Sequence, residues 1–272
     1  TYTPLFVKLR FFIGALIRGK WDLGYWRKYE KNLDQDYRFT LCADAIVAPS
    51  EAMRSWVVDN WHIDDKKITV IPNIFKAADS LSRIKRPTNY KTVIFFGRLN
   101  VLKGLVNATK AMKLFLSENP DWKWTVVGSD GPSHVIGVTM QQWMEQQLSN
   151  VISQVHFTGG LTSEELAHEL AFADVALLPS LFESFSYTCI EALAAGLPVI
   201  GSKIGGMSDF IISGINGYLI DPYNVKDILF ALKVIGESDN FAKRQASARD
   251  TINMFSGDIL ADKYVKLYKS LT

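Results

Sequence analysis

Two carboxylates, Glu183 and Glu191, lie eight positions apart where a loop passes into a helix. The apolar run Val175–Leu178 before them predicts a short buried strand, and Tyr187–Ala194 has a helical pattern that Gly196 ends. Glu183 is therefore expected on the loop and Glu191 about one turn inside the helix. Unpaired amides at the helix N-terminus can hold an anion, and carboxylates can hold sugar hydroxyls. The block favours a nucleotide-sugar site, although a bare pair of glutamates would also fit a solvated helix face.

Two cations follow another candidate strand. Thr92–Gly97 predicts a buried strand, with Arg98 directly after it and Lys103 five residues further on. Arginine offers a planar fork of donors and lysine a compact charge, so together they suit a diphosphate. Taken alone, the motif fits a surface loop with two solvated cations better.

Glycines and a helix cap mark two further loops. The predicted strand Lys123–Gly128 ends on a glycine, which would let a ligand approach the backbone closely. Thr162 and Glu165 have the spacing of a capping box for the predicted helix Ser163–Phe172. The capping box is expected to be structural.

Alternating strands and helices must position these groups. From residue 92 onward the patterns follow the order of a doubly wound α/β domain. The expected strands are Thr92–Gly97, Lys123–Gly128, Val155–Thr158, Val175–Leu178, Pro198–Gly201 and Gly217–Ile220. The expected helices include Leu105–Ser117, Ser163–Phe172, Tyr187–Ala194, Asn224–Glu237 and Gly257–Leu271. Two strand candidates, Ala45–Pro49 and Thr69–Ile71, precede them.

These motifs, in this order, resemble the family 4 glycosyltransferases, which are retaining enzymes of the GT-B fold. The resemblance rests on the Glu-x7-Glu block at 183–198, the Gly-Arg-x4-Lys-Gly loop at 97–104, and the glycine motifs at 124–132, 155–166 and 205–217; it covers about residues 40–270. Asp209 stands where the family usually has glutamate, so no role is carried over to it.

The resemblance implies a role for each motif. Arg98 and Lys103 would hold the donor phosphates, Glu183 would orient the sugar, and Glu191 would accept hydrogen bonds from the ribose. The backbone at Gly159, Gly160 and Leu161 would line the base. The implied catalytic residues are Glu183, Arg98 and Lys103, and the implied donor-binding residues are Arg98, Lys103, Gly128, Gly160, Leu161, Glu183, Ser184, Phe185, Ser186, Tyr187, Thr188 and Glu191.

The implied reaction is retaining transfer of a hexosyl group from a nucleoside-diphosphate sugar to a glycan or lipid-linked acceptor. A UDP-sugar is the first choice of donor and GDP-mannose the second, and neither a cofactor nor a metal is expected. One alternative is a nucleotide-sugar-binding module that is inactive alone because its acceptor domain is incomplete. Another is a GT-B relative such as a sugar-nucleotide epimerase. Paired carboxylates also occur in glycosidases, but a glutamate inside a helix beside a phosphate-type loop argues against that class.

The implied architecture is an α/β protein of the GT-B type. It would combine a complete C-terminal Rossmann-like donor domain with a partial N-terminal Rossmann-like acceptor domain, because the chain opens at Thr1 without methionine and only two early strands are expected. The expected divisions are residues 1–75 for the acceptor domain, 76–91 for a linker, 92–254 for the donor domain, and 255–272 for a helix that crosses back.

Composition indicates a folded cytoplasmic protein. The chain has 272 residues, of which 48% are hydrophobic, and a net charge of +2 argues against nucleic acid as a partner. Two cysteines, Cys42 and Cys189, form no disulfide framework, and the histidines lack metal-ligand spacing. The Asp-x-Asp at 34–36 follows a helix-like run, Tyr25–Leu33, and is discounted as a metal site. Residues 5–20 are apolar and basic, which fits either peripheral binding to an anionic membrane surface or a helix packed in the acceptor domain.

Overall fold

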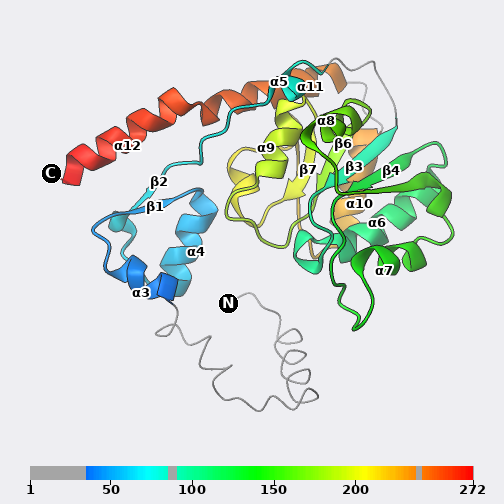
Figure 1. The fold of residues 1–272 in the computed structure, drawn as a ribbon, viewed down its shortest axis with the longest axis horizontal. Coiled ribbons are helices and arrows are strands. Elements are labelled where there is room, and N and C mark those ends of the chain that lie inside the picture. Colours follow the sequence, from blue (N-terminus) through cyan, green and yellow to red (C-terminus); the bar gives the residue numbers. More distant parts are fainter. Residues whose placement is uncertain (1–34, 85–90, 237–240, 272) are drawn as a thin grey trace, which may run out of the picture.

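A computed structural model describes residues 35–84, 91–236 and 241–271 of the chain, with backbone alone for residue 236 and residues 241–245. Two parallel sheets organise these residues (Figure 1). The larger has six strands in the order β5-β4-β3-β6-β7-β8. Its strands are β3 (Thr92–Phe96), β4 (Lys123–Val127), β5 (Val155–Gly159), β6 (Val175–Leu178), β7 (Val199–Ser202) and β8 (Gly217–Ile220). This is the strand order of a doubly wound Rossmann-type sheet, with β3 as its first strand.

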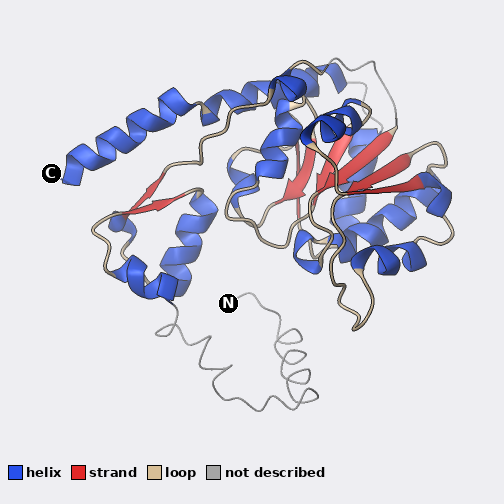
Figure 2. Cartoon of the chain, viewed as in Figure 1, coloured by secondary structure: helices blue, strands red, loops and turns tan. Residues whose placement is uncertain are grey.

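Helices cover both faces of the larger sheet, as Figure 2 shows. One layer contains α6 (Leu105–Glu118), α7 (Met140–Gln147) and α10 (Val225–Gly236). The other contains α5 (Asp79–Ser82), α8 (Ser163–Ala171), α9 (Tyr187–Ala194) and α11 (Phe241–Asp250). Because both faces are covered, β6 is buried along its whole length and reads as a continuous apolar run.

A smaller unit precedes the large sheet. It contains α3 (Gln35–Leu41), β1 (Ile46–Ala48), α4 (Glu51–Trp61) and β2 (Ile68–Val70), and β1 pairs with β2 in parallel. Its own small core consists of Ala48, Val57, Ile63 and Ile68. The predicted strands and helices that fall on described residues are confirmed, each within one residue at either end. The sequence analysis names no counterpart for five described helices, which are α3, α4, α5, α7 and α11.

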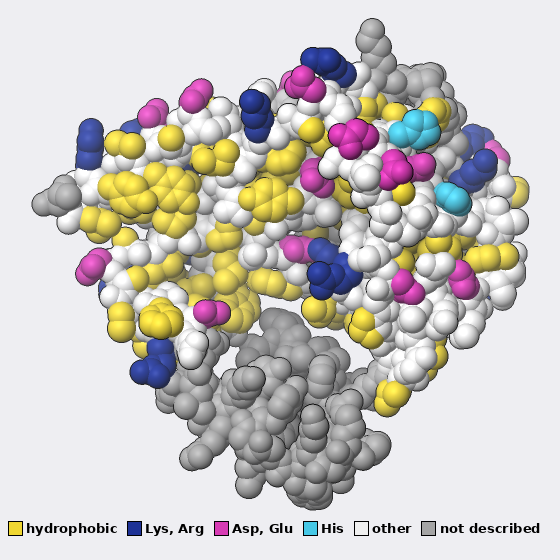
Figure 3. Space-filling model, in the orientation of Figure 1, with side chains coloured by type: hydrophobic (Ala, Val, Ile, Leu, Met, Phe, Trp, Pro, Cys, Tyr) yellow, Lys and Arg dark blue, Asp and Glu magenta, His cyan; other side chains and the backbone are white. Residues whose placement is uncertain are grey.

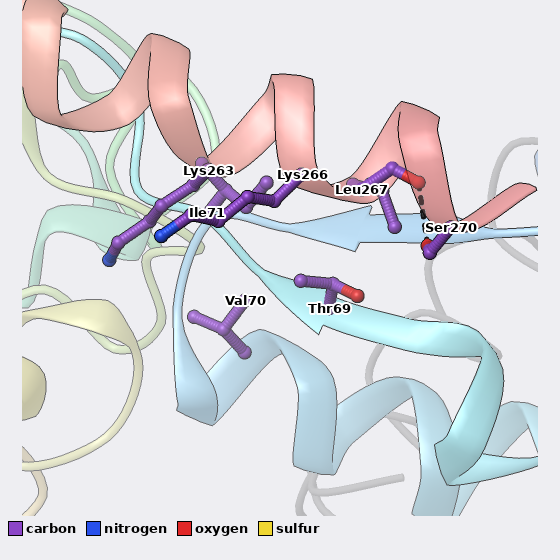
Figure 4. Close-up of a pocket in the computed structure, with 7 residues that line it drawn as sticks. All are labelled: Thr69, Val70, Ile71, Lys263, Lys266, Leu267 and Ser270. Carbon is purple, nitrogen blue, oxygen red and sulfur yellow. Dashed lines mark hydrogen bonds between the residues drawn. The ribbon is translucent and has the colours of Figure 1, made fainter.

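The last helix, α12 (Gly257–Leu271), lies alongside β2 (Figure 4). An open groove of about 350 Å³ runs between them, lined by Thr69, Val70, Ile71, Lys263, Lys266, Leu267 and Ser270. Where the chain joins the two units, the Phe75 amide donates to the Phe255 carbonyl at 3.1 Å. The expected division of the chain into an acceptor domain, a linker, a donor domain and a helix that crosses back stays a prediction.

The expected linker at 76–91 is not uniformly extended. It includes α5, and both Leu81 and Ile84 are buried in the core of the larger unit. The guanidinium of Arg249 donates to the Ile84 carbonyl. Among the described helices, none is long and apolar enough to cross a membrane. The expectations for residues 5–20, for Tyr25–Leu33 and for Asp34 lie outside the described residues.

Candidate functional site

The candidate site lies where the strand order of the large sheet reverses. Strands β3 and β6 are hydrogen-bonded neighbours, although β4 and β5 intervene in the sequence. In sheets of this kind, ligands bind outside the carboxyl ends of the strands at such a switch point. The loop after β3 carries Arg98 and Lys103, and the loop after β6 carries Glu183. The topology therefore brings the two motifs singled out from the sequence to one edge.

Lys103 and Glu183 form an ion pair across this edge. The Lys103 ammonium group contacts Glu183 Oε1, and the Ser180 hydroxyl donates to the same oxygen at 3.1 Å. The two side chains are largely withdrawn from water, with 26% of Lys103 and 19% of Glu183 exposed. Figure 3 shows acidic (magenta) and basic (dark blue) side chains near the centre of the face in view. Ser180 was not anticipated as a site residue, although its place directly after β6 and Pro179 is a sequence signal.

The first turn of α9 faces the same point. A Cβ added to Gly97 would lie 3.9 Å from the Thr188 methyl group and 4.0 Å from Lys103 Cε. The Ser186 hydroxyl caps the helix by accepting from the Cys189 amide at 3.3 Å and contacts the Thr188 hydroxyl at 3.1 Å. The positive end of the helix dipole is thus directed at the Lys103 loop, where it favours a bound anion.

Arg98 projects from a firmly held loop. Its side chain is exposed, whereas the next residue, Leu99, is buried and its amide donates to the Ser129 carbonyl at 2.9 Å. On the other side, Asn100 caps the short helix that ends at Lys103, because its side-chain oxygen accepts from the Lys103 amide at 3.0 Å. The backbone that carries both cations is therefore fixed, and the guanidinium is left accessible to a ligand.

Close packing explains why a glycine, Gly128, directly follows β4. Gly128 has φ of 146°, and a Cβ there would lie 1.9 Å from the Gly97 carbonyl oxygen. Its amide also donates to the Gly159 carbonyl at 2.8 Å. Close contact between adjacent strand ends therefore requires glycine here, and the donor contact expected of Gly128 stays a prediction. Gly160 is exposed with open space beside it, and Leu161 packs on the edge of the main core.

Of the residues that follow Glu183, some are buried in the core and others are exposed to solvent. The Phe185 ring is buried in edge-on contacts with Tyr187, Phe210 and Phe255, so its side chain serves packing and only its backbone could meet a donor. Ser184 is exposed, and Tyr187 is 47% exposed. The donor-binding roles expected of these residues are not tested by the geometry.

Glu191 is partly buried in α9, as expected, and burial raises the pKa of its carboxyl above the ordinary value. Within the described structure, no hydrogen bond joins it to Glu183 or Lys103. Two causes also raise the pKa of the buried Cys189 thiol well above its ordinary range, first burial and then the charge of Glu183. The thiol is therefore protonated at neutral pH and is not a nucleophile.

A second contact reaches the Glu183 loop from the smaller unit. The Ser50 hydroxyl donates to the Ser184 carbonyl at 2.7 Å, and Asp209 Oδ2 accepts from the Glu51 amide at 2.7 Å. Neither Ser50 nor a role for Asp209 was anticipated, since both contacts depend on tertiary structure. Across the described residues, no cluster of three or more His, Cys, Asp or Glu side chains could hold a metal ion. The expectation that no metal is needed stays a prediction.

This geometry defines a doubly wound α/β protein of the GT-B type, with a switch-point site suited to an anionic ligand that carries hydroxyl groups. The chain belongs to the glycosyl transferases group 1, whose family model matches residues 78–250. A second model, Glycosyltransferase Family 4, matches residues 12–78. The resemblance inferred from the sequence motifs is thereby confirmed.

Relatives and solved structures agree with this assignment. The chain is 30% identical over 209 residues to a glycogen synthase of Mycobacterium tuberculosis, covering 76% of this chain and 49% of that protein. It is 26% identical over 246 residues to a D-inositol 3-phosphate glycosyltransferase of a Nocardioides species, covering 84% and 54%. The chain thus spans about half the length of these relatives.

Solved structures give the same fold. A glycosyltransferase from Rickettsia africae superimposes with a TM-score of 0.71 at 20% identity, covering 87% of this chain and 67% of that one. Anabaena HepE, solved in complex with UDP, gives a TM-score of 0.67 at 20% identity, covering 84% and 64%. At these identities the likeness shows the GT-B fold alone.

Proposed function

We propose that this protein transfers a hexosyl group from a nucleoside-diphosphate sugar to a glycan or lipid-linked acceptor, with retention of configuration. The observation that carries the proposal is the Lys103–Glu183 pair at the switch point, beside the first turn of α9. It combines a phosphate-binding cation, a carboxylate for sugar hydroxyls and a helix N-terminus. Membership of the family supports the same activity.

Donor binding would rearrange the ion pair. In the structure Lys103 pairs with Glu183. A diphosphate offers Lys103 a more highly charged partner, and exposed Arg98 can add a forked contact from the same loop. Glu183 would then be released to accept hydrogen bonds from the donor sugar. Glu191, further along α9, would accept them from the ribose.

The proposed chemistry depends on charge stabilisation. The bond between the anomeric carbon and the diphosphate breaks through an oxocarbenium-like state, and negative charge grows on the leaving phosphate. Arg98, Lys103 and the amides near Ser186–Thr188 are held in advance against that charge, each preorganised donor contributing about 3–4 kcal/mol. The acceptor hydroxyl attacks from the face that the phosphate leaves, and its proton passes to the phosphate. Neither a dedicated base nor a metal is required.

A UDP-sugar is the favoured donor and GDP-mannose the second choice. The relatives are named for glycogen and for inositol phosphate, which fits a glycan or lipid-linked acceptor in polysaccharide or glycolipid synthesis. We place the protein in the cytoplasm, with the apolar and basic residues 5–20 as a means of peripheral attachment to a membrane.

One observation favours a second candidate function. The smaller unit has a parallel sheet of only two strands within the described residues, and two strands alone make a marginal core. A nucleotide-sugar-binding module that transfers nothing by itself would have this appearance. It would bind the donor through the larger unit and lack acceptor-dependent turnover.

Two measurements test these proposals in turn. Thermal unfolding with UDP, GDP or ADP identifies the nucleotide, because a ligand that binds the folded state raises the melting temperature. UDP is expected to give the largest rise. Release of UDP from UDP-glucose is then followed with and without oligosaccharide or lipid-linked acceptors. Release that depends on the acceptor supports the transferase, whereas binding without release supports the binding module. No shift with any nucleotide would contradict both.

A further inference from the structure

We propose that Ser50 and Asp209 are positioning residues for Glu183, and that they act by docking helix α4 of the smaller unit onto the loop that carries it. The inference rests on the proposed function in one respect, which is the assignment of the donor sugar as the ligand of Glu183. The contacts themselves are independent of any ligand. They concern two residues to which the family resemblance assigned no role.

Ser50 uses both hydrogen-bonding capacities of its hydroxyl. It accepts from the Met53 amide at 3.0 Å, which caps α4, and it donates to the Ser184 carbonyl at 2.7 Å. The side chain is almost fully buried, with 1% exposed, so water cannot replace either partner easily. The cap of α4 and the position of Ser184 are therefore linked through one atom.

Asp209 binds the same helix end from the other side. Its Oδ2 accepts from the Glu51 amide, the first amide of α4, at 2.7 Å. A carboxylate at a helix N-terminus is stabilised by the helix dipole. Asp209 belongs to the short helix Gly206–Asp209, whose first residue in turn donates its amide to the Glu183 carbonyl at 2.8 Å. One short segment thus holds both α4 and the backbone of Glu183.

The glycines before Asp209 permit this close contact. A Cβ on Gly205 would lie 2.3 Å from the Glu183 carbonyl oxygen, and one on Gly206 would lie 2.5 Å from that of Ser184 and 3.1 Å from Ser50 Cβ. Gly205 also has φ of 103°, which glycine adopts without strain. The Gly-Gly pair is therefore explained by the approach of three backbone segments around Glu183.

The residue before Glu183 meets α4 as well. The Phe182 ring lies 6.4 Å from that of Trp56, centroid to centroid, in a tilted contact. Both neighbours of Glu183 in the chain therefore touch the smaller unit, Phe182 through Trp56 and Ser184 through Ser50. The geometry fixes the Glu183 backbone from α4, while Lys103 and Ser180 hold its side chain from the larger unit.

The test compares UDP with UDP-glucose as probes, because Glu183 is assigned to the sugar. Calorimetric titration should show that Ser50→Ala and Asp209→Ala bind UDP within about twofold of the unchanged chain. Their preference for UDP-glucose over UDP should fall by up to about tenfold, the scale of one hydrogen bond. Asp209→Asn, which keeps an acceptor oxygen, should restore most of the preference. Asp64→Ala is the matched control, since it removes the cap of the short helix Asp65–Lys67 in the same unit.

Two further readouts separate the outcomes. In a Glu183→Ala background, Ser50→Ala should have no further effect on the preference, because the two act through one group. Hydrogen exchange at the Gly206 amide should accelerate about tenfold in Asp209→Ala and stay unchanged in Asp64→Ala. If hydrogen exchange at the Gly206 amide is the same in Asp209→Ala as in the wild-type chain, the inference is overturned, whatever the titrations with UDP and UDP-glucose show. If the wild-type chain binds neither probe, the UDP-sugar assignment fails and hydrogen exchange alone decides the positioning role.

Discussion

Lys103 and Glu183, separated by 80 positions in the chain, share one ion pair at the junction of β3 and β6. Each is the candidate partner of a different part of the proposed donor, phosphate for the lysine and sugar for the glutamate. In the structure each satisfies the other's charge. This pairing offsets part of the cost of withdrawing two charges from water.

Replacing Lys103 with alanine should weaken the binding of UDP by about 1.5–3 kcal/mol, the scale of a charge-assisted hydrogen bond. Arg98→Ala should act similarly, because its exposed side chain lies on the same loop as Lys103. Binding of uridine should change far less, since it has no phosphate. Isothermal titration with both ligands measures the difference.

Lys233→Ala is a matched control for the loss of a lysine. Its ammonium group pairs with Glu118 Oε2 at 2.6 Å on the surface of the larger unit, between α10 and α6. This variant should bind UDP normally. An equal loss for uridine and UDP in Lys103→Ala would contradict the phosphate assignment.

Replacing Glu183 and replacing Glu191 should affect the binding of different ligands. Glu183→Ala should leave UDP affinity nearly unchanged and lower both the affinity for UDP-glucose and the rate of transfer, because its proposed partner is the sugar. Glu191→Ala should weaken UDP and UDP-glucose alike, by about 1–2 kcal/mol, because its proposed partner is the ribose. Titration of each variant with both ligands checks this. The same loss of UDP affinity in both variants would show that the roles are wrongly divided.

Much of the larger unit could be predicted from the sequence because of how it is buried. A parallel strand covered on both faces is a continuous apolar run, and Val175–Leu178 was located with its observed bounds. The alternation of strands and helices predicted a doubly wound domain, and the observed strand order brings the loops after β3 and β6 to one edge. Lys103 and Glu183 were assigned to one site by the family resemblance, which rests on the motifs and their order.

What the sequence did not provide was the set of tertiary partners. That Lys103 pairs with Glu183 depends on side-chain directions, which spacing does not define. Asp209 and Glu51 are 158 positions apart, and no local pattern relates them. Likewise, the sequence shows a glycine at position 128 but not whether a ligand or the backbone approaches it. The short distance from a Cβ at this position to the Gly97 carbonyl oxygen shows that the backbone does.

Gly104, which follows Lys103, should tolerate no side chain. Its φ is 73°, and a Cβ would lie 1.8 Å from the Pro179 carbonyl oxygen on the loop after β6. Gly104→Ala should lower the free energy of unfolding by more than about 2 kcal/mol, since steric overlap adds to a backbone strain of about 1–2 kcal/mol. Gly137→Ala provides the strain alone, because Gly137 has φ of 78° with nothing within 4 Å. Urea denaturation should give Gly104→Ala a much lower free energy of unfolding than Gly137→Ala. An equal loss of stability in the two variants would contradict the proposed steric overlap.

Protonation of Glu191 should link stability to pH. Burial raises the pKa of this carboxyl in the folded state above its ordinary value of 4.5, so the folded chain retains a proton that the unfolded chain has already lost. The contribution of Glu191 to stability is therefore greatest below about pH 4.5 and declines as the pH rises through the raised pKa. Glu191→Gln removes this dependence.

At neutral pH, ligand-free Glu191→Gln should therefore be more stable than the unchanged chain, and the difference should disappear as the pH falls below about 4.5. Urea denaturation of both proteins across this range measures it. Glu165→Gln is the opposite control, because the Thr162 amide and hydroxyl lower the pKa of that carboxyl; its capping contribution is present at neutral pH and is lost as the pH falls. A Glu191→Gln variant less stable than the unchanged chain at neutral pH would mean that the carboxylate of Glu191 has a stabilising partner.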